Sequence, residues 1–206
     1  MLNIITLPLP PFQTNTYIVF EKYKGKCIII DPASSFSIIK NKISEFKLNP
    51  SLIFLTHGHF DHIGACEELR EEYKVPLAIH ENDAELLTSS RLNASSLLLG
   101  QEIILKPAEK LLKDSDCIKI EAYKLRVMHT PGHTQGSCVL IGENEIFSGD
   151  TLFNSGYGRY DLPGGSFEDL AKSLEKIFDL KESLTVYPGH GSTTNIYDEK
   201  YTLKIY

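Results

Sequence analysis

Three of the chain's seven histidines lie within six residues, 57–62, in the order His-Gly-His-Phe-Asp-His. His57, His59 and Asp61 stand at i, i+2 and i+4. Side chains with this spacing converge on an extended or tightly turned backbone, whereas on a helix i and i+2 do not face each other. Gly58 is expected to supply the backbone freedom that brings them together. Asp61 and His62 are adjacent and therefore diverge, so one short loop offers two separate pairs of metal ligands.

Three further candidate ligands come from later loops. His133 ends a Thr-Pro-Gly-His turn, Asp150 follows Ser-Gly, and His190 follows Pro-Gly. A single His or Asp beside a glycine is more often a turn or capping residue. Five of seven histidines at such positions, beginning with the 57–62 string, instead favour a metal centre. Imidazole nitrogens and carboxylate oxygens suit zinc, iron, manganese or nickel.

The elements that must position these loops follow from the spacing of apolar residues. A helix over 35–47 presents Phe36, Ile39, Ile43 and Phe46 on one face, and Pro50 is expected to stop it. Further helices are predicted over 63–73, from an N-cap at Ser166 with Asp169 as capping-box partner to about 179, and after 191. Lys24-Gly25 is a plausible hairpin turn, and 88–107 is expected to be loop with some short helix. Strands are predicted over 3–7, 16–20, 27–30, 51–55, 76–79, 117–121, 124–128, 137–141, 145–147 and 185–187.

Strands therefore come in runs, with helices between some of them. This order is typical of an α/β (α+β) chain in which two sheets pack face to face with helices outside, here as one domain over 1–206. A doubly wound parallel sheet ranks second, because it would alternate strand and helix more strictly.

Composition narrows the class of protein. Hydrophobic residues make up 42% and charged residues 23%, an ordinary globular mix, and the formal charge is −6. The lack of a basic stripe argues against nucleic acid, and the short apolar runs argue against a membrane span. Prolines 8, 10 and 11 interrupt the first apolar run, which argues against a signal peptide. Four widely spaced cysteines favour reduced thiols in the cytoplasm. A small-molecule substrate is the expected partner, and a homo-oligomer remains open.

In order and spacing, the 57–62 string, His133, Asp150 and His190 resemble the metallo-β-lactamase superfamily over nearly the whole chain. The flanking Asp31-Pro32 and Thr130-Pro131-Gly132 resemble it too. The resemblance implies an αβ/βα four-layer sandwich with the site at one sheet edge. It also implies the ligand assignment: a first metal on His57, His59 and His133, a second on Asp61, His62 and His190, and Asp150 as the bridge.

Within this superfamily, the segment 149–165 is similar to small glyoxalase II-like hydrolases. Position 150 is Asp, unlike the Cys of antibiotic-hydrolysing lactamases, which disfavours that activity. His59 stands where flavin-linked di-iron oxygen reductases have Glu. Sixteen residues follow His190, which is too few for the helical extension that grips glutathione in full-length glyoxalase II, so that extension is not expected here. Specificity for a glutathione thioester therefore stays open.

The expected chemistry is hydrolysis. Two divalent metals, zinc in preference to iron or manganese, would share a hydroxide whose parent water has its pKa lowered toward ~7. Asp61 is expected to orient that hydroxide or shuttle its proton, and the alternative is that it is a ligand only. No strong general acid stands out, and a thiolate, with a thiol pKa near ~8.5, departs without one, so a thioester is preferred over an amide.

For the substrate, Arg159 is the candidate that would hold a carboxylate, with Tyr157 and Tyr160 lining the pocket. A structural Arg159 paired with Asp161 is an equal alternative. His80 and His129 are assigned structural or supporting roles, and Cys66 is assigned to the core.

Three rival functions remain. The resemblance also fits a mononuclear iron persulfide dioxygenase using His57, His133 and Asp150. A lactonase or phosphodiesterase of the same superfamily is a second alternative. The third is a metal-binding protein without turnover.

Overall fold

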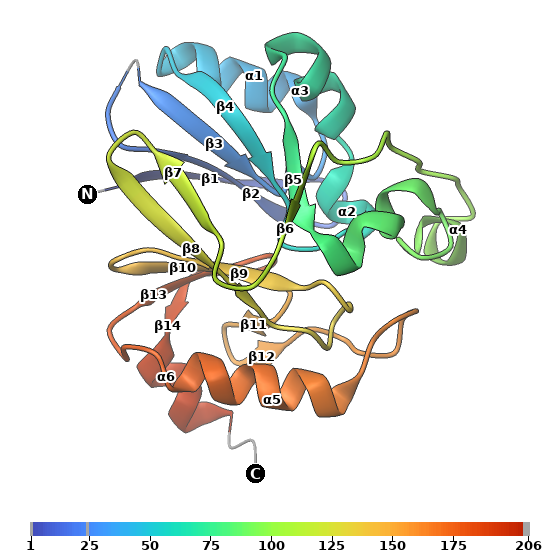
Figure 1. Cartoon of the computed structure of the whole chain (residues 1–206), viewed down its shortest axis with the longest axis vertical. Helices are drawn as coiled ribbons and strands as arrows, with labels where there is room; N and C mark the ends of the chain where they lie inside the picture. The colour runs from blue at the N-terminus through green and yellow to red at the C-terminus, as the bar shows by residue number, and fades with distance from the viewer. Residues whose placement is uncertain (1, 24, 204–206) are drawn as a thin grey trace.

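The computed structural model describes residues 2–23 and 25–203, and it contains two mixed six-stranded sheets (Figure 1). The first has the order β1-β2-β3-β4-β5-β6 and the second β14-β13-β10-β9-β8-β7. Helices α1 and α3 cover the outer face of the first sheet, and α5 and α6 cover that of the second. The chain is therefore the four-layer sandwich that the resemblance implied.

The bounds of the elements follow the chain. The first sheet is built from β1 (Asn3–Leu9), β2 (Thr14–Phe20), β3 (Lys26–Ile30), β4 (Asn49–Phe54), β5 (Leu77–His80) and β6 (Lys110–Leu112), with α1 (Phe36–Glu45), α2 (Phe60–Ile63), α3 (Cys66–Tyr73), the 3-10 helix η1 (Glu81–Thr88) and α4 (Ser95–Leu98). The second contains β7 (Cys117–Ile120), β8 (Tyr123–His129), β9 (Cys138–Ile141), β10 (Glu145–Gly149), β13 (Thr185–Pro188) and β14 (Thr194–Asn195), with the hairpin β11 (Leu152–Phe153) and β12 (Gly156–Tyr157), α5 (Phe167–Phe178) and α6 (Ile196–Thr202).

Strand β2 is apolar on both of its faces, because helices cover one face of the first sheet and the second sheet covers the other. Ile18 and Phe20 pack under the helices, whereas Tyr17 and Val19 point into the layer between the sheets. Successive side chains of a strand point to opposite faces, so a strand covered on both sides becomes a continuous apolar run. No helix of the described residues is both long and apolar enough to cross a bilayer.

Two helix predictions needed correction. Pro50 does not stop α1. The helix ends at Glu45, Lys47 turns into the left-handed region, and Pro50 lies within β4. The predicted helix 63–73 is two helices, because the amides of Gly64 and Ala65 donate to carbonyls of residues 33 and 32 instead of continuing one helix.

The other predictions were mostly confirmed. Ile39 and Ile43 are buried on α1, and Ser166 caps α5 by accepting from the Asp169 amide. The reciprocal half of that capping box is absent, because the Ser166 amide donates to the Gly132 carbonyl. A short strand, β14, precedes the predicted terminal helix, and β6 and the β11–β12 hairpin were missed. Of the predicted Lys24-Gly25 turn, Lys24 lies outside the described residues.

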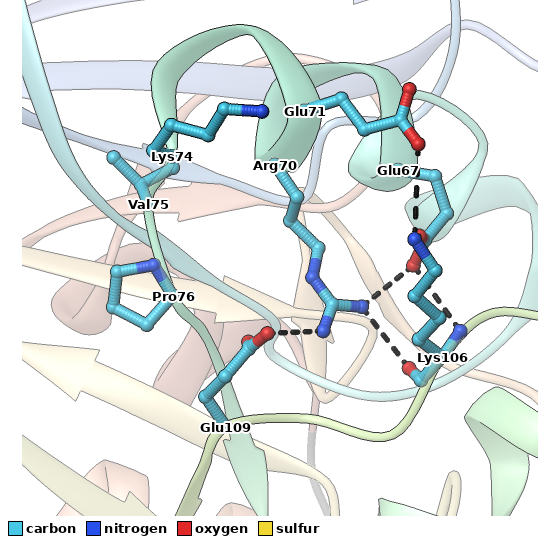
Figure 2. A pocket seen from close by; sticks show the side chains of 8 residues that line it. All are labelled: Glu67, Arg70, Glu71, Lys74, Val75, Pro76, Lys106 and Glu109. Atoms are coloured by element: carbon cyan, nitrogen blue, oxygen red, sulfur yellow. Dashed lines mark hydrogen bonds and ion pairs between the residues drawn. The ribbon is translucent and has the colours of Figure 1, made fainter.

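Arg70 of α3 binds the chain segment that leads into β6 (Figure 2). Its guanidinium donates to Glu67 at 2.6 Å, to the carbonyl of Pro107 at 2.9 Å and to Glu109. Glu109 in turn accepts from the amide of Leu77 in β5 at 2.8 Å. These contacts bind the chain segment leading into β6 against the edge of the first sheet.

Candidate metal centre

All four candidate ligand loops follow the carboxyl ends of strands. His57 lies beyond β4, His133 beyond β8, Asp150 beyond β10 and His190 beyond β13. Strand β10 is parallel to β13 and antiparallel to β9, which is itself antiparallel to β8, so β8, β10 and β13 run the same way. Their carboxyl ends therefore share one edge of the second sheet, and the loop after β4 meets them from the first sheet.

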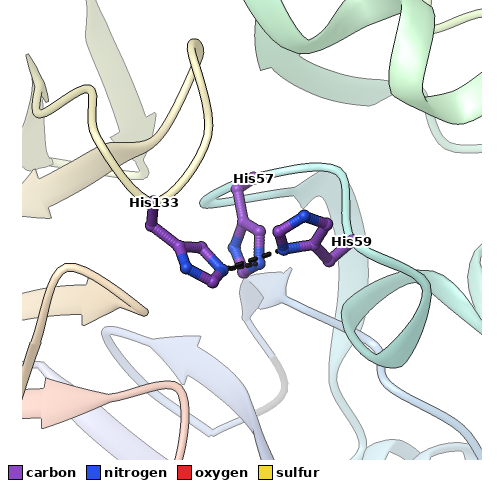
Figure 3. A group of neighbouring side chains, drawn as sticks. All are labelled: His57, His59 and His133. Carbon is purple, nitrogen blue, oxygen red and sulfur yellow. Dashed lines mark hydrogen bonds between the residues drawn. The ribbon is translucent and has the colours of Figure 1, made fainter. Parts of the chain in front are cut away.

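Three imidazoles form the first cluster, His57, His59 and His133 (Figure 3). Nε2 of His133 lies 2.8 Å from Nδ1 of His59 and 3.2 Å from Nε2 of His57. The far nitrogens of two rings are already engaged. Nδ1 of His57 lies 3.1 Å from the Thr56 hydroxyl, and Nδ1 of His133 lies 2.6 Å from the Arg159 carbonyl. A carbonyl accepts only, so His133 carries its proton on Nδ1 and turns the lone pair of Nε2 toward its neighbours.

The second cluster contains Asp61, His62 and His190. Asp61 Oδ2 lies 3.2 Å from Nε2 of His190 and 3.7 Å from Nε2 of His62. Asp150 stands between the clusters. Its Oδ1 lies 3.3 Å from Nε2 of His62, while its Oδ2 lies 3.6 Å from Nε2 of both His133 and His190. One carboxylate thus faces both groups.

The donor atoms fit divalent cations. Nε2 of His62 and Oδ1 of Asp150 are buried and lack hydrogen-bond partners in the described structure. Buried polar atoms without partners are costly and rare, and here they converge with other nitrogens and oxygens within 4.8 Å. Such nitrogen and carboxylate sets bind zinc, iron or manganese, so the donor types do not select one metal.

Electrostatics differ between the clusters. Burial, and then repulsion from His133, lowers the pKa of His59 to about 3, and the pKa of His57 is also depressed, first by burial. Burial alone would lower the pKa of His62, but the carboxylates of Asp150 and Asp61 outweigh it and raise that pKa well above its ordinary value. His57 and His59 are therefore neutral at pH 7, with ring nitrogens able to accept a cation.

A buried carboxylate, Asp31, orients ligands of both clusters. Its Oδ1 accepts from the Thr56 amide at 2.8 Å, and its Oδ2 accepts from the Thr56 hydroxyl at 2.7 Å. The same Oδ2 lies 3.0 Å from Nδ1 of His62, which leaves Nε2 of that ring for a cation. Because the Thr56 hydroxyl donates to Asp31, its oxygen accepts from His57. Ring orientations on both sides thus depend on Asp31, a role that sequence reasoning missed although Asp31-Pro32 was noted.

A second buried carboxylate, Asp83, joins two ligand loops. It accepts from the Gly58 amide at 3.0 Å in the loop of His57 and His59. It also accepts from the Thr134 hydroxyl at 2.7 Å and the Gly136 amide at 2.6 Å, both in the loop of His133. Asp83 is fully buried, in η1, and nothing in its local sequence marks it for this role.

Glycines at the site allow close approach. A side chain at Gly58 would place Cβ 2.6 Å from that of Leu86, so Gly58 lets η1 pack against the ligand loop. Its φ lies outside the left-handed region, which corrects the expectation that its backbone freedom is what matters. A Cβ at Gly189 would collide with Oδ1 of Asp150 and with the ring of His62.

A cavity of about 260 Å³ opens over the ligands. Besides ligands, it is lined by Phe12, Phe60, Leu98, Leu99, Arg159 and Leu162. The predicted Tyr157 and Tyr160 are not among its lining residues; both rings pack against Phe167 at the surface. Arg159 lines the cavity but is also paired with Asp161, at 2.8 Å from Nε and 2.9 Å from a terminal nitrogen.

The remaining histidines and Cys66 lie outside the ligand clusters. His80 and His129 stack with ring centroids 4.0 Å apart, and Nε2 of His129 lies 2.9 Å from the Gln135 carbonyl. Cys66 is the first residue of α3 and is buried in the core, as predicted.

Comparison with known proteins agrees with this geometry. Residues 9–190 match the model of the metallo-beta-lactamase superfamily. A probable metallo-hydrolase YqgX from Bacillus subtilis is 38% identical, covering 94% of this chain and 92% of that protein. The hydroxyacylglutathione hydrolase GloC from Haemophilus influenzae is 32% identical, covering 97% and 95%. The crystal structure of the B3 metallo-beta-lactamase BLEG-1 superposes with a TM-score of 0.91 at 36% identity, over 98% of this chain and 97% of that one. By its ligand clusters, its layers and these matches, the chain belongs to the metallo-beta-lactamase superfamily.

Proposed function

We propose that the protein is a binuclear metallo-hydrolase that cleaves thioesters. The observation that carries this proposal is Asp150, whose two oxygens face two separate ligand clusters. We assign one cation to His57, His59 and His133 and a second to Asp61, His62 and His190, with Asp150 between them. Two divalent cations would supply a Lewis acid for the carbonyl oxygen and a water of lowered pKa as nucleophile.

Asp61 is the residue of this set placed to orient the attacking water. Its Oδ2 accepts from the Thr14 hydroxyl at 3.4 Å and lies 3.2 Å from His190, while its side chain remains 15% exposed to the cavity. It can therefore accept a hydrogen bond from the attacking water and orient it, while its lowered pKa keeps it ionised. In the balanced reaction, the water oxygen bonds to the acyl carbon, the carbon–sulfur bond breaks, and the products are a carboxylate, a thiol and one proton.

The choice of a thioester rests on what the cavity lacks. Among the described lining residues outside the ligand set, Arg159 is the single titratable group, and a guanidinium does not give up its proton in proteins. A leaving group must then depart without a general acid. A thiolate does so readily, because its conjugate thiol has a pKa near ~8.5. The match to a hydroxyacylglutathione hydrolase over 95% of that protein's length supports the same substrate class.

A second candidate is β-lactam hydrolysis, because a B3 metallo-beta-lactamase shares the fold at 36% identity. That likeness weakens the argument from Asp150 against antibiotic hydrolysis. The amide nitrogen of a β-lactam needs a proton as it leaves, and the cavity offers no evident donor. We therefore rank it below thioester hydrolysis.

One assay separates these activities. The protein is loaded with zinc, iron or manganese and given S-lactoylglutathione, other glutathione thioesters and a chromogenic cephalosporin. We expect kcat/KM of at least about 10⁴ M⁻¹s⁻¹ on a thioester, the lower end for efficient enzymes. The proposal fails if no thioester is turned over with any metal, and the search then moves to β-lactams, lactones, phosphodiesters and persulfides.

A further inference from the structure

A second cavity, of about 340 Å³, lies beside the metal centre under the tip of the β1–β2 hairpin. Its walls include Pro10 and Pro11 of that tip, Ala33, and Ile103 of the segment after α4. Four residues line both cavities: Phe12, Phe60, Asp61 and Leu99. The second cavity therefore adjoins the first, and the candidate ligand Asp61 lies between them.

The lining of this second cavity is apolar and nearly uncharged. Asp61 is its single charged residue among the described ones, and that carboxylate belongs to the proposed metal site. The Ser34 hydroxyl is already used, since it donates to the Pro10 carbonyl at 2.5 Å. No lysine, arginine or histidine lines it among the described residues, so an anionic group would lose water without gaining a cationic partner; the one free amide donor is that of the exposed Gln101. Its chemistry suits a neutral hydrocarbon group.

The walls are held in place by contacts to the ligand loop. The backbone amide of Phe60 donates to the backbone carbonyl of Asn93 at 3.0 Å. The side-chain nitrogen Nδ2 of the buried Asn93 donates to the Ile103 carbonyl at 2.7 Å. Phe12 meets Phe60 edge to face, with ring centroids 5.3 Å apart. The segment around Asn93 thus connects the apolar wall directly to the backbone between His59 and Asp61.

We infer that this cavity is an acyl pocket, which binds the apolar acyl chain of the substrate while the thiol portion lies toward Arg159 and Leu162. This inference rests on the proposed thioesterase function and adds a specificity to it. An acyl chain longer than acetyl gains contact with Phe60, Leu99 and Ile103. A carboxylate-bearing acyl group of the same length gains no cationic partner there.

The test is a series of thioesters that differ in the acyl group alone: acetyl, butanoyl, hexanoyl and succinyl on one thiol. Burial of one methylene is worth up to about fourfold in kcat/KM. We expect hexanoyl to exceed acetyl by at least about tenfold, and succinyl to fall below butanoyl. Equal rates for acetyl and hexanoyl would overturn the pocket.

Three variants locate the effect. Ile103→Trp fills the cavity and should reduce the hexanoyl-to-acetyl ratio about tenfold. Gln101→Lys, at an exposed lining position, should narrow or reverse the preference for butanoyl over succinyl, and it covers the case in which the tryptophan variant does not fold. Ile104→Trp is the matched control, because Ile104 is 57% exposed and does not line the cavity. If Ile104→Trp changes the ratio as much as Ile103→Trp, the pocket is not the cause.

A binding measurement separates failure of the pocket from failure of the proposed reaction. Calorimetry compares hexanoate and acetate on the zinc-loaded protein and on Ile103→Trp. A dissociation constant for hexanoate at least about tenfold lower, lost in the variant, supports the pocket even if no thioester is cleaved. Equal constants for the two acids refute it, whatever the turnover.

Discussion

Replacement of Asp83 by alanine tests whether one buried carboxylate holds two ligand loops together. The change leaves the amides of Gly58 and Gly136 without partners, and both glycines are buried. Each unsatisfied buried donor costs about 1–3 kcal/mol, so the sum is about 2–6 kcal/mol. Burial raises the pKa of Asp83, which means that the buried carboxylate itself destabilises the folded state. Removing this carboxylate offsets part of the loss, so we expect a net loss of stability of about 2–4 kcal/mol. This is a large share of a typical stability of about 5–15 kcal/mol.

Urea unfolding of the metal-free protein measures that loss, and competition with a zinc chelator measures affinity at the centre. We expect affinity to fall about 10–100-fold, as when supporting groups of metal ligands are removed. Glu81→Gln is the matched control in the same helix, because Glu81 pairs with Lys113 at 3.5 Å on the exposed surface. This substitution should change the free energy of unfolding by less than about 0.5 kcal/mol. A free energy of unfolding for Asp83→Ala within about 1 kcal/mol of that of the original protein, together with the same affinity for zinc, would refute the reasoning.

Three further predictions concern the site itself. Asp150→Ala should lose both metal and activity, and metal analysis alongside turnover checks this; a variant with full metal and normal rates contradicts the two-cation assignment. Because burial lowers the pKa of His59 to about 3, the unfolded chain binds a proton at this residue before the folded chain does. The stability of the metal-free protein should therefore fall as the pH drops from about 6.5 to 3. His59 alone contributes up to about 1.4 kcal/mol per pH unit, and His57, whose pKa burial also depresses, adds to the slope in the same direction. Urea titrations at pH 7, 6, 5 and 4 measure that slope, and a flat profile counts against it. Arg159→Ala should leave KM unchanged if the pairing with Asp161 is its whole role, whereas a raised KM with the same kcat assigns it to substrate binding.

The local sequence predicted well what depends on neighbouring residues. The apolar face of α1 and the cap at Ser166 are local patterns, and both were confirmed. The structure brings the seven candidate ligands together, because their loops follow strands and the strand order sets where they meet. They form three overlapping groups: His57, His59 and His133; His57, His62 and Asp150; and Asp61, His62 and His190. Which of these groups hold metal ions stays a prediction.

What the sequence could not predict depends on partners far along the chain. The break between α2 and α3 arises because amides of residues 64 and 65 find carbonyls in the loop after β3. Pro50 enters a strand because Lys47 has already ended the helix. Asp83 binds groups 25, 51 and 53 residues away, and no spacing rule connects those positions. Likewise, the segment 88–107 gave no sign that its Asn93 and Ile103 form the wall of a cavity.

Every ligand loop lies at the carboxyl end of β4, β8, β10 or β13. One end of these strands therefore carries the reacting groups, and the other end only connects the strands. The tight turns between β7 and β8 and between β9 and β10 lie at the opposite ends of β8 and β10, and none of their residues belongs to a ligand group. Mutations that gain or lose stability can accumulate in those turns while the reacting groups stay untouched. Conversely, the ligand loops can vary in length and lining without rebuilding the sheets. Such a division makes the scaffold evolvable, because new substrates are reached by altering one rim of the molecule while the other preserves the fold.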